Sequence, residues 1–377
     1  MKLAIAGGGT GGHLFPALAV AEALCRRRIG VSDILFIGAD RGLEARLVPT
    51  YGYPLELLAA RPFKGQGVAA RAEAVLRLPA LVAAARRILR RFAARAVLGV
   101  GGYASVPTVL AAASLRLPVL LQEQNRWPGL ANRLLQPLVD QVLAVDAGAA
   151  RFFRPGKLLV TGNPVPAERG SGGSAADFGL ERDRLTVLVL GGSRGAVAIN
   201  RVVADALPRL VPLAERVQFL HAAGEGEVEP LRAAYGHAGI ASHVAPFIER
   251  MGAAYGAAGA VIARAGAMSC QEIANAGLPS LLIPYPYAAN DHQWYNGLRL
   301  REAGGALLLR QETVDGEVVA DVVRSWIEDP DGRQRQGGAA HTLAAPDAAD
   351  RIADLLLASA NGTQPTRADG SRRHHIL

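Results

Sequence analysis

The chain has 377 residues, half of them hydrophobic and a fifth charged, with a formal net charge of +8; this length favours two domains over one core. No apolar run approaches the ~20 residues that span a bilayer, and the short apolar start "KLAIA" is not expected to be a signal peptide. The cysteines Cys25 and Cys270 exclude a disulfide framework and a zinc spacing, which favours a reducing cytoplasmic setting.

Apolar runs alternate with helical stretches along the first half of the chain. The run "LAIA" leads into a glycine-rich loop and then into a helix predicted over Pro16–Arg27. Further buried strands are predicted at "ILFIGA", "RAVLGVGG", "PVLLQEQN", "QVLAV" and "KLLVTGNP". Continuous apolar strands separated by helices are typical of a parallel sheet covered on both faces.

The same pattern begins again after a linker-like segment, residues 166–184. Strands are predicted at "LTVLVL", "VQFLHAAG", "HVAPF", "GAVIARAG", "PSLLIPYP" and "GALLL". The sequence therefore predicts an α/β protein with two Rossmann-like doubly wound domains and a cleft between them. The expected boundaries are 1–163 and 164–340, followed by a helix within 341–360 that returns to the first domain and a disordered tail, 361–377.

Three glycine-rich turns lie where a predicted strand gives way to a helix: "GGGTGG" at 7–12, "GVGGYAS" at 99–105 and "GGSRGA" at 191–196. Glycine allows a phosphate to approach backbone N–H groups at a helix start. Tight glycine turns are also a structural requirement of α/β folds, so each turn alone is a weak signal. The first turn satisfies the dinucleotide pattern G-x-G-x-x-G, for which Asp40 would be the acidic residue after the second strand.

His13 follows the first turn directly. Imidazole is the side chain best suited to proton transfer near neutral pH, although a histidine here is also compatible with simple packing or capping. In a dinucleotide-binding loop it would crowd the pyrophosphate, so it favours a catalytic or substrate-facing role.

A second polar constellation lies between residues 263 and 297. Ser269-x-x-Glu272 has the spacing of a helix capping box; alternatively, Glu272 accepts hydrogen bonds from a ribose diol. Asp291, His292 and Gln293 follow, and side chains of this kind suit the several hydroxyls of a sugar.

Taken in order, these motifs resemble those of the MurG family of bacterial glycosyltransferases. They are "GGTGGH" with Pro16, "GGY" at 101–103, "EQN" at 123–125, "GNPV" at 162–165, "GGSRGA", "EIANAGLP" at 272–279 and "HQ" at 292–293. The resemblance runs from Lys2 to about Leu357. It implies the GT-B fold and inverting transfer of N-acetylglucosamine (GlcNAc) from UDP-GlcNAc to the C4 hydroxyl of the muramyl sugar of lipid I, giving lipid II.

The resemblance also implies roles for individual residues. His13 is the first candidate for the general base and Glu123 the alternative. Donor contacts are implied for Thr10, Gly11, Gly12, Asn125, Ser193, Ile248, Arg264, Ala267, Met268, Ser269, Cys270, Gln271, Glu272 and Gln293. Acceptor contacts are implied for Gly9, Gly101, Gly102 and Tyr103. No cofactor or bound metal is expected to be required, with Mg²⁺ at most assisting the diphosphate.

The positive charge is concentrated in one segment. Residues 61–102 hold nine basic residues and one acid. The net charge of this segment, +8, equals the net charge of the whole chain. An apolar strip lies among the arginines, and it predicts docking on the anionic inner leaflet that carries lipid I, rather than on nucleic acid. The alternative is an amphipathic helix packed on the sheet. The predicted membrane residues are Leu78, Leu81, Val82, Arg86, Arg87, Arg90 and Arg91, with Trp127 either in the same interface or in the core. The expected location is peripheral, on the cytoplasmic face of the bacterial plasma membrane.

Some positions depart from the family pattern. Pro166 stands where a basic residue usually follows "NPV", and Tyr287 replaces a usual histidine. The competing functions are another GT-B UDP-sugar transferase, a sugar-nucleotide epimerase, an NAD-dependent oxidoreductase and a non-enzymatic membrane-associated binding protein.

Overall fold

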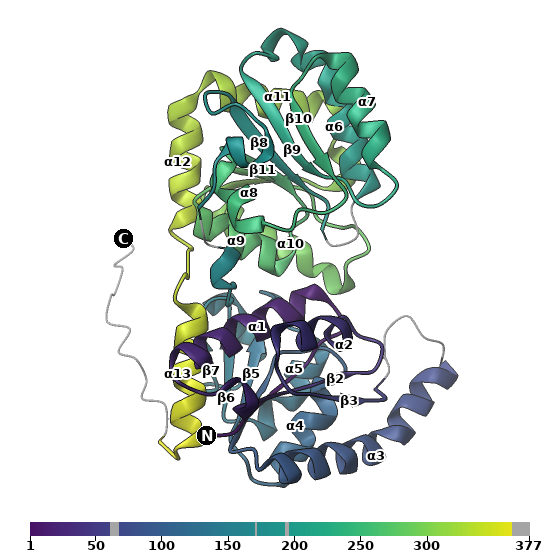
Figure 1. Ribbon diagram of the computed structural model, residues 1–377, viewed down its shortest axis with the longest axis vertical. Coiled ribbons are helices and arrows are strands. Elements are labelled where there is room, and N and C mark those ends of the chain that lie inside the picture. Colours follow the sequence, from purple (N-terminus) through teal and green to yellow (C-terminus); the bar gives the residue numbers. More distant parts are fainter. Residues whose placement is uncertain (61–67, 170–171, 193–195, 364–377) are drawn as a thin grey trace.

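The computed structural model describes residues 1–60, 68–169, 172–192 and 196–363. Within them the chain forms two lobes, each an all-parallel sheet covered by helices on both faces (Figure 1). Of the tail predicted to be disordered, residues 364–377 lie outside the described part.

The first sheet has the strand order β3-β2-β1-β4-β5-β6-β7. Its inner strands are almost wholly apolar and are mostly buried on both faces, whereas the edge strands β3 and β7 are partly exposed. The short β3, which contains the charged Glu56, was not predicted from the sequence. The strands are β1 (Leu3–Ala6), β2 (Ile34–Ala39), β3 (Leu55–Leu58), β4 (Ala96–Gly99), β5 (Val119–Glu123), β6 (Gln141–Ala144) and β7 (Leu158–Val160).

The second sheet repeats this order as β10-β9-β8-β11-β12-β13. Its strands are β8 (Leu185–Leu190), β9 (Val217–Ala222), β10 (Ser242–Ala245), β11 (Ala260–Ala263), β12 (Ser280–Leu282) and β13 (Ala306–Leu308). In open parallel sheets, ligands bind beyond the carboxyl ends of the strands where the strand order reverses. That point lies between β1 and β4 in the first lobe and between β8 and β11 in the second.

Helices cover both sheets. The first lobe has α1 (Gly11–Arg26), α2 (Glu44–Leu47), α3 (Val68–Phe92), α4 (Ser105–Ser114) and α5 (Leu130–Leu135). The second has α6 (Val197–Leu210), α7 (Val228–Ala238), α8 (Met251–Ala257), α9 (Ala267–Ala276), α10 (His292–Glu302), α11 (Gly316–Glu328) and α12 (Pro330–His341). Of the helices that the structure describes, none has the length and apolar character needed to cross a bilayer.

The last helix, α13 (Ala348–Ala360), packs beside α1 of the first lobe (Figure 1). Ile352 and Leu356 are fully buried in the same core cluster as Leu18 of α1. At the rim, Arg26 donates to Asp350 at 3.0 Å, and Arg27 pairs with both Asp350 and Asp354. The chain therefore passes between the lobes twice, before β8 and after α12.

Candidate functional site

Two glycine loops of the first lobe contact each other beyond the ends of β1 and β4. Gly7, Gly8 and Gly9 all have positive φ angles (152°, 148° and 91°), which side chains rarely tolerate. A Cβ on Gly102 would lie 2.4 Å from the carbonyl oxygen of Gly8, so only glycine permits this approach. The acceptor-side residues predicted from separate motifs thus lie together where the strand order reverses, between β1 and β4.

His13 lies in the first turn of α1, because this helix begins at Gly11 and not at the predicted Pro16. Its Nδ1 is 3.2 Å from the hydroxyl of Thr10, the N-cap residue. A Cβ on Gly101 would lie 2.8 Å from the imidazole ring, so the second glycine loop covers one side of the histidine.

The environment of His13 keeps its ring neutral. Desolvation lowers the pKa of His13 to about 4, a hydrogen bond with the Gly8 backbone opposes this shift, and the nearby His292 of the other lobe adds to it. At pH 7 the imidazole is therefore unprotonated and available to accept a proton.

Glu123, the other candidate base, is buried at the end of β5 and organises the loop that follows. One carboxylate oxygen accepts from the backbone N–H of Asn125 at 2.9 Å and from its side chain at 3.3 Å. The other accepts from Gly129 at 3.0 Å and from Asn132 at 2.8 Å. Desolvation raises the pKa of this carboxyl, although all four donors oppose the shift.

In the second lobe, α9 begins at Ala267 with Gly266 as its N-cap. The predicted donor residues Ala267, Met268 and Ser269 therefore form its first turn, where free amides and the helix dipole favour an anion. The capping-box alternative is wrong, because Ser269 lies inside the helix and is not its cap.

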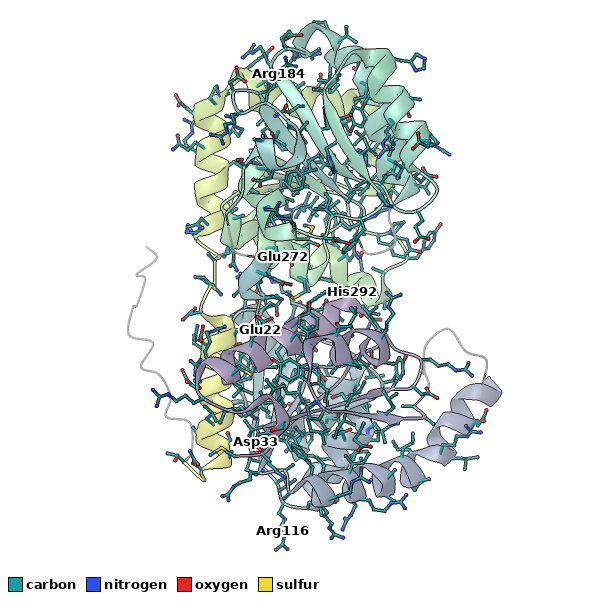
Figure 2. The ribbon with its side chains drawn as sticks, viewed as in Figure 1. Glu22, Asp33, Arg116, Arg184, Glu272 and His292 are labelled. Carbon is teal, nitrogen blue, oxygen red and sulfur yellow. The ribbon has the colours of Figure 1, made fainter. Side chains whose placement is uncertain are left out.

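Glu272 accepts a 2.9 Å hydrogen bond from the hydroxyl of Tyr255 on α8. Both residues line a cavity of about 430 Å³ that also borders Pro166, Asn275 and Pro346. Figure 2 shows Glu272 and His292 near the junction of the two lobes. Ile248, whose backbone is predicted to meet the base, is buried in the core cluster that contains Tyr255.

Other predicted donor residues have partners within the protein. The guanidinium of Arg264 donates to the carbonyls of Ile283 (3.0 Å) and Pro284 (3.1 Å) and to Gln311 (2.7 Å), which ties together the segments that follow β11, β12 and β13. The side-chain oxygen of Gln293 accepts from the backbone N–H of Tyr285 at 2.8 Å.

Asp291 is paired with Arg310 at 2.6 Å. Burial raises the pKa of the Cys270 thiol to about 12, so this group is a packing residue at neutral pH. Ser193 lies outside the described residues.

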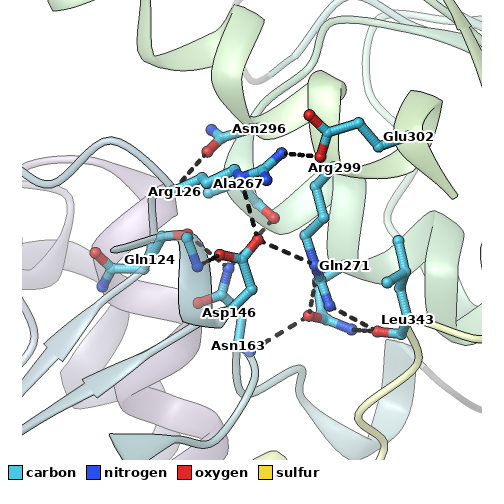
Figure 3. Close-up of polar contacts among 11 residues, drawn as sticks. Gln124, Arg126, Asp146, Asn163, Ala267, Gln271, Asn296, Arg299, Glu302 and Leu343 are labelled. Carbon is cyan, nitrogen blue, oxygen red and sulfur yellow. Dashed lines mark hydrogen bonds and ion pairs between the residues drawn. The ribbon is translucent and has the colours of Figure 1, made fainter. Parts of the chain in front are cut away.

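A polar network joins the lobes (Figure 3). The amide of Asn296 on α10 donates to Asn125 at 3.1 Å and accepts from the Arg126 backbone at 3.0 Å. Asp146 lies between two arginines, 3.5 Å from Arg126 and 3.6 Å from Arg299.

Gln271 belongs to this network and is fully buried. It accepts from the Asn163 backbone at 3.4 Å and donates to the carbonyl of Leu343 at 3.2 Å. Its side chain thus holds both interlobe connections together. Trp127 lies at this lobe junction, where its ring is stacked on that of Tyr295 of α10 at 4.6 Å between centroids.

Comparison with known proteins places this geometry in a family. Residues 3–144 match the glycosyltransferase family 28 N-terminal domain, and residues 186–352 match its C-terminal domain. A transferase from Anaeromyxobacter dehalogenans is 40% identical over 357 residues, covering 95% of this chain and 92% of its own. One from Geobacter metallireducens is 39% identical over 360 residues, covering 95% and 99%. Both are named UDP-N-acetylglucosamine–N-acetylmuramyl-(pentapeptide) pyrophosphoryl-undecaprenol N-acetylglucosamine transferase.

The chain belongs to the MurG family. The crystal structure of Acinetobacter baumannii MurG superimposes with a TM-score of 0.76 at 29% identity, covering 94% of this chain and 99% of that one. This MurG-family protein is a glycosyltransferase, and its two lobes form the GT-B fold, as predicted. A Staphylococcus aureus MnaA–UDP structure matches with a TM-score of 0.67 at 13% identity, which indicates a shared fold alone.

Sequence reasoning missed three residues of the candidate site: Glu44 beneath the first glycine loop, Tyr255 beside Glu272, and Asn296 between the lobes. Each is a single polar residue in a helical stretch, and only its distant partners distinguish it. In the part of the chain that the structure describes, no three His, Cys, Asp or Glu side chains gather as a metal site.

Proposed function

We propose that this protein transfers GlcNAc from UDP-GlcNAc to the C4 hydroxyl of the muramyl sugar of lipid I, with inversion, to form lipid II. In this proposal, residues 1–163 hold the acceptor, residues 164–340 hold the donor, and the helix within 341–360 fastens the second unit to the first. The observation that carries it is geometric: two glycine loops of the first lobe close on His13 in the first turn of α1, and in the second lobe α9 begins directly after the strand at the corresponding switch of strand order. Gln293, the residue next to His292, is the predicted contact of the donor sugar.

The chemistry requires a base on one side of the sugar and charge stabilisation on the other. The acceptor O4 attacks the anomeric carbon while the bond from that carbon to the diphosphate breaks, and the O4 proton passes to His13. The electrons of the broken bond leave with UDP, whose negative charge meets the first-turn amides of α9. His13 is favoured over Glu123, because hydrogen bonds from the surrounding loop engage both carboxylate oxygens of Glu123.

Three residues with implied donor contacts already have hydrogen-bond partners within the protein, and these partners change the roles that we propose for them. Arg264 and Gln271 are engaged with protein acceptors and donors, so they support the donor loops rather than bind UDP. Gln293 is oriented by Tyr285, which leaves its amide nitrogen to meet a sugar hydroxyl. Pro166 borders the cavity beside Glu272, where it replaces the usual basic side chain with an apolar wall.

Membrane association is proposed for the face that carries α3. Arg87, Arg90 and Arg91 are exposed, although Arg91 also pairs with Glu56 at 2.5 Å. Arg86 donates to Ser114 at 2.8 Å. Leu81 and Val82 pack partly on the core of the lobe, so the helix combines both alternatives weighed from the sequence. Leu76 is 80% exposed, so its apolar side chain is available for contact with lipid. The protein is thereby expected to lie peripherally on the anionic cytoplasmic leaflet.

The deciding experiment is transfer of radiolabelled GlcNAc from UDP-GlcNAc to a short-chain lipid I analogue. A labelled disaccharide product that forms only with the acceptor supports the proposal, with or without EDTA. Conversion of UDP-GlcNAc in the absence of acceptor would instead favour the epimerase alternative.

A further inference from the structure

The glycine loop that precedes His13 already holds an anion, and that anion belongs to the protein. Glu44, the first residue of α2, is buried with 1% exposure. One carboxylate oxygen accepts from the backbone N–H of Gly9 at 2.7 Å, and the other accepts from the N–H of Ala39 at 2.8 Å. The side chain therefore joins the loop after β1 to the end of β2.

Three glycines make room for this carboxylate. A Cβ on Gly8, Gly38 or Gly42 would lie 2.1, 2.3 or 2.2 Å from the Glu44 side chain, and in each case the three nearest atoms all belong to Glu44. Gly38 and Gly42 do not have positive φ angles, so their need for glycine comes from the carboxylate and not from the backbone. The fold therefore provides a defined space for the Glu44 carboxylate, bounded by three glycines.

The loop that Glu44 holds leads directly to the proposed base. Gly9 precedes Thr10, whose carbonyl accepts from the backbone of His13 at 3.2 Å and whose hydroxyl meets the imidazole. The orientation of the Gly9 peptide thus sets the start of α1 and the direction of its first-turn side chains.

We propose that Glu44 is a positioning residue for glycosyl transfer: it fixes the glycine loop so that His13 faces the donor sugar. The inference rests on the proposed function. It also reassigns Gly9, because the Gly9 amide is occupied by Glu44 and does not hold the diphosphate of the acceptor. A fixed loop matters because a misplacement of about 1 Å can cost on the order of 100-fold in rate.

The test is Glu44→Gln. The carboxamide has nearly the same shape, but its NH₂ group faces one of the two backbone N–H donors, so one hydrogen bond is lost. We expect kcat to fall on the order of 100-fold, with a much smaller change in the KM for UDP-GlcNAc, since most of the implied donor contacts lie on the other lobe. The matched control is Asp140→Asn, which removes a carboxylate that accepts from the Val119 backbone at 2.7 Å, at the amino ends of β5 and β6 and thus at the opposite end of the strands.

A double-mutant cycle separates positioning from general destabilisation. Gly42→Ala should lower kcat in the parent protein, where its Cβ displaces the carboxylate, and should add nothing in Glu44→Ala, where the space is empty. Equal kcat for folded Glu44→Gln and the parent, or additive losses in the cycle, would overturn the inference. If the parent itself transfers no GlcNAc, the proposed function fails instead.

Discussion

The hydroxyl of Tyr255 donates to Oε2 of Glu272 across 2.9 Å, and this bond joins α8 to α9 beside a cavity that the second lobe forms with the two connecting segments. It orients the carboxylate that is proposed to accept hydrogen bonds from the ribose of UDP. A residue that the sequence did not single out thus supports one that it did.

We therefore expect Glu272→Ala to weaken UDP binding by about 1.5–3 kcal/mol, the range for a hydrogen bond to a charged group. Tyr255→Phe removes only the orienting hydroxyl and should have a smaller effect in the same direction. Isothermal titration with UDP measures both. Unchanged affinity in Glu272→Ala would show that the nucleotide binds elsewhere.

His13→Ala should abolish most transfer while UDP binding persists, because the base and the nucleotide site lie on different lobes. In the parent, the acidic limb of kcat/KM should lie near pH 4 and not near 6.5, because desolvation lowers the pKa of His13 to about 4 in the free protein. An anionic acceptor beside the ring should raise the pKa of His13 in the complex. The value of kcat should therefore begin to fall at a higher pH than the value of kcat/KM does. Profiles that are identical in parent and variant would contradict the assignment.

Asp146 separates two arginines at the lobe junction, and Asp146→Asn leaves their charges facing each other. Arg126 keeps its pair with Glu302, but the largely buried Arg299 loses its acidic partner. We therefore expect a loss of about 1–3 kcal/mol in unfolding free energy and faster proteolysis between the lobes. Asp321→Asn, which breaks an exposed pair with Arg324, is the control and should change stability by less than about 1 kcal/mol. Equal effects in the two variants would argue against a role for Asp146 in holding the lobes.

His221 is buried beneath α6 and α7, bonded to Tyr235 and Asn200 at 3.0 Å each. Desolvation lowers its pKa to about 3, below the unfolded value of 6.5. Between these values the unfolded chain binds more protons, so unfolding free energy should fall as pH drops, by up to about 1.4 kcal/mol per pH unit. Denaturant melts from pH 7 to 4 measure this slope, and His221→Gln should reduce it.

Arg87 and Arg90 are two of the exposed cations of α3. The double change Arg87→Gln, Arg90→Gln should weaken binding to vesicles that contain phosphatidylglycerol, since each arginine near an anionic surface contributes about 1 kcal/mol. Arg182→Gln with Arg335→Gln, in the second lobe, is the control of equal charge. Equal binding by both double variants would remove the membrane role of α3.

Local sequence patterns were sufficient for every described strand except β3 and for the first two glycine turns. A buried parallel strand is an apolar run, and a close backbone approach such as Gly102 against Gly8 requires glycine, so both features are written in consecutive residues. The order of the motifs was likewise sufficient to indicate the family.

Only the tertiary structure decided which polar residues serve the site and which serve the fold. Gln271 and Arg264 lie in recognisable motifs, yet their hydrogen bonds go to residues far away in the sequence, at the lobe junction and after β12. Glu44 has no motif, yet it holds the loop that carries His13. The role of a buried polar group is set by which partners surround it, and those partners are brought together by folding rather than by sequence spacing.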